Sequence, residues 1–335
     1  INQMTELQKV YGADNVMTRF SGTASTGAII ILAHYDSVYT GPGAADNGSG
    51  TAALLEIARA LSAGPALNND IIVLFDDGEE LPDMFTGSRA FVRDHPWMQD
   101  VRMAISMDTA VAGPISTCET GQDNGVLIQA MARTYTDAAW TSFGSGGGGY
   151  DSAPFRDAGI MSLALEDNYP FKEKHTDQDV VGIVRAGSVQ QMGEQVLSLA
   201  RELGGMDLSQ PRAAHQTYFP LPFILLVHYP ESWTVPLFLI ATLLMIALFV
   251  LAFRRKLITW RSLLLAFGVI LAAATLAALL VSVLTPALPG LFGWDVNLWP
   301  DWPEVIPPNG IFAYAGFFIL TIIKNTPNEL IIKGS

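Results

Sequence analysis

The chain has 335 residues, half of them hydrophobic, and a formal net charge of −13 at pH 7. Phosphate binding needs clustered Lys and Arg, so an acidic chain without a basic stripe excludes nucleic acid as a partner. Cys118 is the single cysteine, which excludes an intrachain disulfide and leaves His and carboxylates as the groups able to hold a metal.

Charge is concentrated in the first part of the chain. Residues 1–215 carry 27 acidic and 13 basic side chains, whereas residues 216–335 carry 5 and 6. The first part is typical of an acidic soluble domain, and the second has too little charge to cover a water-facing surface of its size. The opening residues show no signal-peptide pattern and give no information on targeting.

Apolar runs and helical patterns alternate over the first 215 residues. Buried strands are predicted at 28–33, 71–75, 103–107 and 160–165. Helices are predicted at 51–61, 87–92, 126–139 and 181–203. This alternation predicts an α/β domain with a mainly parallel sheet, in which functional residues collect where strands end.

Two later segments interrupt this pattern. The glycine run at 146–149 predicts a mobile loop or a plain linker. Residues 218–229 are aromatic and β-prone, which predicts a last strand or a junction. We therefore divide the chain into a domain at 1–215, a junction at 216–235 and a final region at 236–335.

Two long uncharged stretches, 236–253 and 262–285, predict transmembrane helices, because each is long enough to cross a hydrocarbon layer. The alternative is a pair of buried core helices, but soluble helices of this length usually have a polar face. A third apolar stretch at 310–323 predicts either a span of a thin membrane or a re-entrant or interfacial segment.

The connection between the two long stretches sets the expected topology. It contains four basic residues, Arg254, Arg255, Lys256 and Arg261. Basic connections belong in the cytoplasm, so the acidic domain is expected on the extracytoplasmic side, whether periplasmic, luminal, vacuolar or extracellular. The sequence thus predicts an integral protein of a lipid bilayer.

Polar side chains follow three of the predicted strands. His34 comes after the first, Glu79 and Glu80 after the second, and Asp108 after the third. Because parallel strands end at the same edge of a sheet, we expect these groups to lie close together. Zinc accepts His and carboxylate ligands when no thiolate is offered, and a two-metal site needs a bridging carboxylate and a free general base.

A wider set of motifs resembles a known family. In chain order they are His34-x-Asp36, Asp46-Asn47-Gly48-Ser49-Gly50, Gly78-Glu79-Glu80, Gly87-Ser88-Arg89-Ala90-Phe91, Asp108 and His175-Thr176. Over about residues 25–200 their order and spacing are similar to those of the di-zinc aminopeptidases, the family 28 zinc peptidases. Together with the apolar tail, the pattern resembles the endoplasmic-reticulum metallopeptidase and vacuolar membrane protease branch of that family.

The resemblance implies a three-layer α/β/α fold with a mainly parallel mixed sheet, and it assigns roles. Residues 1–215 become the catalytic domain, with two Zn²⁺ ions per chain. One ion is held by His34 and Asp108, the other by Glu80 and His175, and Asp46 bridges them. Glu79 is implied to be the general base, and Asp36 accepts a hydrogen bond from the His34 ring and fixes its tautomer.

The sequence departs from the family pattern near the last His ligand. Secreted members often have a Tyr directly before that His, whereas this chain has Lys174. Lys174, Tyr150 or Tyr169 is therefore expected to polarise the substrate carbonyl. Asp151 belongs to a segment that matches a substrate-side family motif only loosely, and it is a further candidate.

The resemblance implies a membrane-anchored exopeptidase that removes residues from the N-terminus of peptides, with Glu79 as the base toward a metal-activated water. Three alternatives stay open: a carboxypeptidase or dipeptidase of the same family, a single-zinc glutaminyl cyclase of related fold, and a receptor-like binding module without activity. A transporter is disfavoured, because neither long stretch contains an ionisable residue. The oligomeric state is left open.

Overall fold

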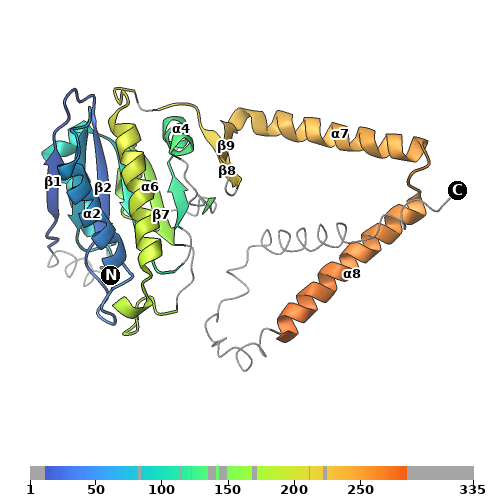
Figure 1. The fold of residues 1–335 in the computed structure, drawn as a ribbon, viewed down its shortest axis with the longest axis horizontal. Helices are drawn as coiled ribbons and strands as arrows, with labels where there is room; N and C mark the ends of the chain where they lie inside the picture. The colour runs from blue at the N-terminus through green and yellow to red at the C-terminus, as the bar shows by residue number, and fades with distance from the viewer. Residues whose placement is uncertain are drawn as a thin grey trace, which may run out of the picture. The chain divides into compact units, whose positions relative to one another are not determined.

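The computed structural model describes residues 12–81, 84–112, 115–121, 123–134, 141–142, 149–167, 172–210, 212–221 and 225–284. The chain divides into two compact units, Ile1–Leu237 and Phe238–Ser335. The first unit contains a mixed sheet with helices on both faces, and the second unit contains long apolar helices (Figure 1).

The described residues form a seven-stranded sheet in the order β1-β3-β2-β4-β7-β5-β6. Its strands are β1 (Val16–Phe20), β2 (Ala28–His34), β3 (Asp70–Asp76), β4 (Val101–Met107), β5 (Ile115–Thr120), β6 (Thr141–Ser142) and β7 (Met161–Asp167). The central strands β3, β2, β4 and β7 are parallel, whereas β1 and β5 run antiparallel to their inner neighbours. The predicted mainly parallel α/β sheet is confirmed, and its four predicted strands are the four central ones.

The sequence analysis missed the outer strands. β1 contributes Thr18 and Arg19 to the edge, and its side chains alternate between exposed and half-buried. β5 contains Ser116, Thr117 and Thr120, which lower its hydropathy although its first residues are buried. Strands without a continuous apolar run have only a weak periodic pattern in the sequence. β1 and β5 are therefore evident only from their pairing with β3 and β7 in the sheet.

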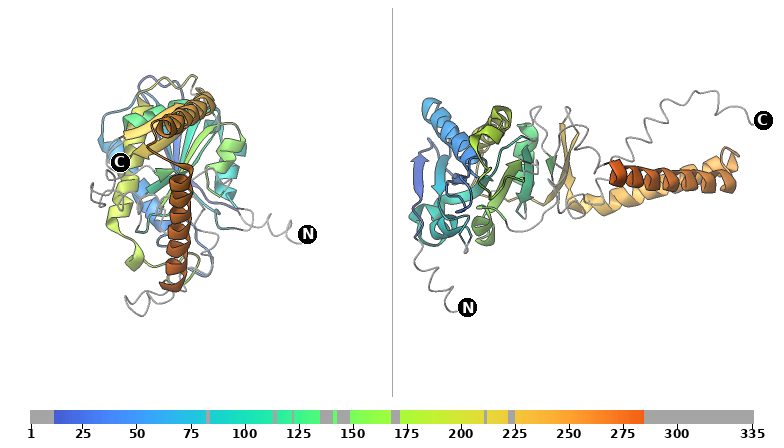
Figure 2. Two further views of the ribbon diagram at one scale, coloured as in Figure 1. Left: turned by 90° about the vertical axis from the view of Figure 1, so that its right-hand side faces the viewer. Right: turned by 90° about the horizontal axis from the view of Figure 1, so that it is seen from below.

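Helices cover both faces of the sheet and make the three layers (Figure 2). They are α2 (Gly48–Ala63), α3 (Thr86–Asp94), α4 (Gly125–Arg133), α5 (Ala153–Asp157) and α6 (Ala186–Gly204), with 3-10 turns at Pro96–Asp100 and Val181–Ile183. The helix predicted at 181–203 is therefore a short turn followed by α6. The helix predicted at 126–139 ends at Arg133, and 135–140 lie outside the described residues, as does most of the predicted loop at 146–149.

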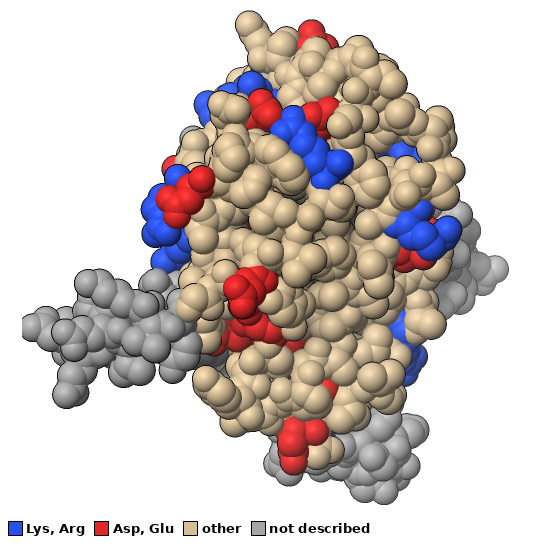
Figure 3. Space-filling view, turned by 90° about the vertical axis from the view of Figure 1, so that its left-hand side faces the viewer, with Lys and Arg blue, Asp and Glu red and all other residues tan. Residues whose placement is uncertain are grey.

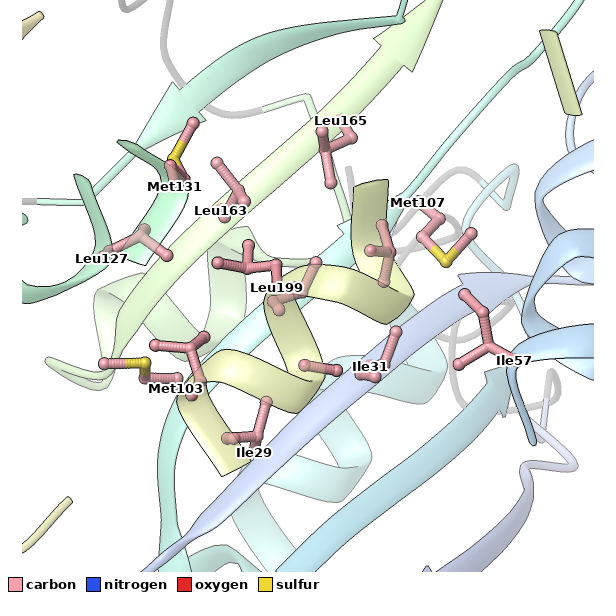
Figure 4. Packing of buried hydrophobic residues seen from close by; sticks show 14 of the residues in the cluster. Ile29, Ile31, Ile57, Met103, Met107, Leu127, Met131, Leu163, Leu165 and Leu199 are labelled. Atoms are coloured by element: carbon pink, nitrogen blue, oxygen red, sulfur yellow. The ribbon is translucent and has the colours of Figure 1, made fainter. Parts of the chain in front are cut away.

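The larger apolar core lies between one face of the sheet and helices α2, α4 and α6. Ile29 and Ile31 of β2 point into it, and Leu199 of α6 packs in the same cluster (Figure 4). The opposite face buries Ile30 and Leu32 against α3 and α5. Alternate residues of β2 thus enter different cores, which explains its unbroken apolar run, and each buried Ile contributes about 1.5–3 kcal/mol.

The aromatic segment at 218–229 forms two strands, not one. β8 (Gln216–Leu221) and β9 (Leu225–Pro230) pair antiparallel as a separate hairpin. Leu226 is buried and belongs to the larger core. The segment is therefore a hairpin that packs on the larger apolar core of the first unit and does not extend the seven-stranded sheet.

Two apolar helices follow the hairpin, after a 3-10 turn at Glu231–Trp233. α7 (Thr234–Arg254) and α8 (Trp260–Leu284) are long and apolar enough to cross a membrane, by length and composition, and none of either candidate span is buried. Their side chains, such as Phe238 and Leu265, are largely exposed, which does not fit buried core helices. The third stretch, 310–323, lies outside the described residues.

Candidate metal centre

The sheet brings the predicted polar residues to one edge. His34 is the last residue of β2 and lies in register with Asp76, the last residue of β3. Glu79 and Glu80 follow β3, and Asp108 directly follows β4. Because β3, β2 and β4 are parallel, their carboxyl ends lie at the same edge of the sheet, and so do the polar residues that end or follow these strands.

The first cluster joins His34, Asp46 and Asp108, whose ligand atoms all lie within 4.8 Å of one another. His34 Nε2 is 3.6 Å from Asp46 Oδ1 and 3.9 Å from Asp108 Oδ1. All three residues are buried, and Asp108 Oδ1 accepts no hydrogen bond from the described residues. A buried carboxylate oxygen without a hydrogen bond is costly, so this cluster fits a divalent cation of the kind that His and carboxylates bind.

The second cluster joins Asp46, Glu80 and His175 within the same limit. His175 Nε2 is 2.8 Å from Glu80 Oε1 and 3.1 Å from Asp46 Oδ2. Asp46 thus belongs to both clusters, with Oδ1 facing one and Oδ2 the other. Each cluster offers one His and two carboxylates, a donor set that fits zinc.

The loop before α2 holds Asp46 in place. The Asp179 carboxylate accepts hydrogen bonds from the backbone N–H groups of Ala45 (2.7 Å) and Asp46 (3.1 Å). Asn47 caps α2 by accepting from Gly50 N at 3.0 Å, and its amide donates to the Met107 carbonyl oxygen at 2.7 Å. The Asn47 side chain therefore ties the start of α2 to the end of β4, next to Asp108.

Asp36 contacts both the His34 ring and the loop that follows β3. Its carboxylate accepts hydrogen bonds from the backbone N–H groups of Glu79 and Glu80, each at 3.1 Å. His34 Nδ1 lies 3.2 Å from the Asp36 backbone oxygen and 3.5 Å from its carboxylate. The nearer partner of the ring is thus the main chain, while the carboxylate mainly holds the loop that carries Glu79 and Glu80. Both contacts leave His34 Nε2 directed at the first cluster.

The electrostatics of the site follow from burial. Burial raises the pKa of Glu79 to about 9, although the nearby His34 opposes the shift. Burial likewise raises the pKa of Asp108 above its usual range. For Asp46, burial opposes ionisation, but the hydrogen bond with His34 and the charge of Lys174 outweigh it and lower its pKa. Burial therefore disfavours the ionised forms of Glu79 and Asp108, whereas nearby positive charge favours that of Asp46.

The remaining predicted residues fall into different environments. Lys174 Nζ lies 3.2 Å from Asp46 Oδ2 and 4.0 Å from Glu166 Oε1. Tyr150 donates a hydrogen bond to Glu166 Oε2 at 2.6 Å. Asp151 is buried, and burial with the neighbouring Asp76 carboxyl raises its pKa. Tyr169 lies outside the described residues.

The sequence analysis did not select Asn47, Asp76, Asp179 or Glu166. Asn47 had a local signal, because Asn is a preferred N-cap residue at the start of a helix. Glu166 lies near the end of β7, so the strand-end rule that predicts His34 and Asp108 also applies to it. Asp179 had no signal, since its partners lie 133 and 134 residues away.

The charges outside the site are mixed in sign. On the face in Figure 3, Lys and Arg side chains are scattered and several lie next to Asp or Glu, while most of that face is uncharged. The concentrated charge described above lies instead in the two clusters at the strand ends.

Comparison with known proteins places this arrangement in a family. The family model for peptidase family M28 matches residues 15–200, more than half of the chain. Endoplasmic reticulum metallopeptidase 1 of Mus musculus is 29% identical over 225 residues, which cover 61% of this chain and 24% of that protein. The vacuolar membrane protease of Candida albicans (strain WO-1) is 28% identical over 249 residues, which cover 69% and 29%.

Solved structures show the same fold. BSAP, a zinc aminopeptidase from Bacillus subtilis, superposes with a TM-score of 0.50 at 24% identity, over 59% of this chain and 52% of that one. The LapA aminopeptidase of Legionella pneumophila gives 0.51 at 19% identity, over 61% and 62%. This chain spans only about a quarter of the length of the two curated relatives. The family match, the shared fold and the two His and carboxylate clusters agree, and the chain belongs to peptidase family M28.

Proposed function

We propose that this chain is a di-zinc exopeptidase that removes N-terminal residues from peptides and is anchored in a membrane. The observation that carries the proposal is the position of Asp46, whose two carboxylate oxygens face separate clusters while Glu79 stands beside them outside both. Two adjacent ion sites with a buried carboxyl group that belongs to neither suit metal-assisted hydrolysis of an amide.

His34, Asp46 and Asp108 would hold one zinc ion, and Asp46, Glu80 and His175 the other. When bound, the two ions supply Lewis acidity, which lowers the pKa of a water molecule and polarises the scissile carbonyl. Glu79 takes the proton of that water as it attacks, and then passes the proton to the departing amine. In its ionised form the Glu79 carboxylate can accept the proton, and in its protonated form it can donate the proton to the amine.

The charged residues around the site could bind either the N-terminal amine or the C-terminal carboxylate of a peptide substrate. The acidic groups favour a free α-amine, as in an aminopeptidase. Lys174 is the observation that favours the second candidate, a carboxypeptidase or dipeptidase, because an ammonium beside the clusters can bind an α-carboxylate. We rank the aminopeptidase first because the carboxylates outnumber this single cation, and because the Bacillus subtilis protein of the same fold is a zinc aminopeptidase.

Chelation and metal analysis test the proposed chemistry. We expect two zinc ions per chain and hydrolysis of aminoacyl substrates that a chelator abolishes and added zinc restores. C-terminal substrates and N-terminal glutaminyl peptides are assayed in parallel, since faster turnover of either would replace the aminopeptidase by a carboxypeptidase or a cyclase. A protein that binds zinc but acts on none of these would be a binding module.

The anchoring part of the proposal rests on α7 and α8. Each would span the bilayer, and the basic residues 254–256 and 261 between them would stay in the cytoplasm, with the catalytic unit on the other side. We expect the chain to stay in the membrane fraction after alkaline carbonate washing and to need detergent for release. A version ending at residue 215 is the comparison, and release of the whole chain by carbonate would contradict the anchor.

A further inference from the structure

Lys174 brings a fixed positive charge to the carboxylate that the two clusters share. Its ammonium lies 3.2 Å from Asp46 Oδ2, the same oxygen that lies 3.1 Å from His175 Nε2. The side chain of Asp46 is 2% exposed and that of Lys174 is 35% exposed, so their contact is only partly screened by water. The second cluster therefore already contains a cation on one of its ligand atoms.

Glu166 offers the same ammonium a second partner. Its Oε1 is 4.0 Å from Lys174 Nζ, a short movement beyond direct contact. Glu166 is itself held by the Tyr150 hydroxyl, which donates to Oε2 at 2.6 Å, and by the Thr109 hydroxyl, 3.4 Å from Oε1. It takes part in neither ligand cluster. Lys174 thus lies between two carboxylates: Asp46, which belongs to both ligand clusters, and Glu166, which belongs to neither.

We propose that Lys174 competes with the second metal ion for Asp46 Oδ2 and withdraws to Glu166 when that ion binds. The ion held by His34, Asp46 and Asp108 then binds first and tightly, and the ion held by Asp46, Glu80 and His175 binds second and more weakly. Glu166 acts as a positioning residue, because it receives the displaced ammonium. The proposal rests on the proposed function only in taking both clusters to be zinc sites.

The asymmetry between the clusters follows from geometry. Lys174 contacts Oδ2, which faces the second cluster, whereas Oδ1 faces His34 in the first. An ammonium a few ångströms from a divalent ion repels that ion, and the repulsion falls as the distance between them grows. Moving the ammonium from Asp46 Oδ2 to Glu166 increases its distance from the second ion and so reduces this repulsion.

Zinc titration of the full chain against a chromophoric chelator tests the proposal. We expect the wild type to bind one ion tightly and a second at least tenfold more weakly, and Lys174→Gln to raise the affinity for the second ion at least tenfold. Lys174→Arg keeps the charge and should keep the weak second site. Lys172→Gln removes an exposed charge two residues away and is the matched control, expected to match the wild type.

Glu166→Gln is expected to lower the affinity for the second zinc ion, whereas Lys174→Gln is expected to raise it. Without its carboxylate, Lys174 should stay on Asp46, so affinity for the second ion should fall at least fivefold. In a Lys174→Gln background, the same Glu166→Gln change should have a much smaller effect, because no ammonium remains to be moved. Equal effects in the two backgrounds would show simple charge loss and would overturn the role of Glu166.

The outcomes separate this inference from the proposed function. If the wild type binds two ions but Lys174→Gln leaves the second affinity within twofold, or lowers it, the competition is wrong while the di-zinc function stands. If the wild type binds no zinc, both fail. Thermal unfolding of each metal-free variant checks that it is folded, and Lys174→Met replaces Lys174→Gln if the latter is not.

Discussion

Replacing Glu79 with Gln is expected to lower kcat for peptide hydrolysis by about 10²–10⁴-fold while both zinc ions stay bound, the range that a positioned general base contributes. Glu79 lies outside both ligand clusters, so its neutral replacement removes no ligand. The amide of Gln has nearly the shape of the carboxyl group but can neither accept nor return the proton. KM should change little, because the change removes an interaction needed only as the bond breaks.

The adjacent residue supplies the control for this experiment. Glu80→Gln alters a group that lies 2.8 Å from His175 Nε2 in the second cluster, so it should reduce the zinc content as well as the rate. The two substitutions therefore separate proton transfer from metal binding. Ordinary turnover by Glu79→Gln, or loss of zinc from it, would remove Glu79 from the role of base.

Replacing Asp46 with Asn is expected to lower the affinity for both zinc ions and to abolish hydrolysis. Asp46 is the only residue shared by the two clusters among the described residues, with one oxygen directed at each. Asn offers a single weaker oxygen donor and no negative charge, so neither ion keeps its full ligand set. We expect the bound zinc to fall from two ions to below one per chain, as measured by atomic absorption after dialysis.

Two further substitutions, Asp108→Asn and Asp77→Asn, serve as controls for the zinc content of Asp46→Asn. Asp108 belongs to one cluster only, so its replacement should weaken one ion and leave the other. Asp77 lies in the same loop as Glu79 and accepts from Asp14 N, outside both clusters, and its replacement should leave the zinc content at two. Retention of two ions by Asp46→Asn would mean that Asp46 does not join the two sites.

Some of the fold and the site could be predicted because the signals are local in the chain. The runs that became β2, β3, β4 and β7 are apolar throughout, since both faces of the central sheet are buried. Given parallel strands, the ends of β2, β3 and β4 must meet, so His34, Glu80 and Asp108 were expected together before any coordinates. The outer strands β1 and β5, which are partly exposed or polar in composition, have too weak a periodicity to be predicted.

The residue pattern alone predicts the strand-end groups, their order along the chain, and the two long uncharged helices. The folded chain adds the sharing of Asp46 between the clusters, the hydrogen bonds from its loop to Asp179, and the place of Lys174 between Asp46 and Glu166. These are contacts between residues far apart in the chain, and their geometry depends on side-chain packing. A residue pattern records which groups are present, but the distances that assign each oxygen to a partner exist only once the sheet and loops are assembled.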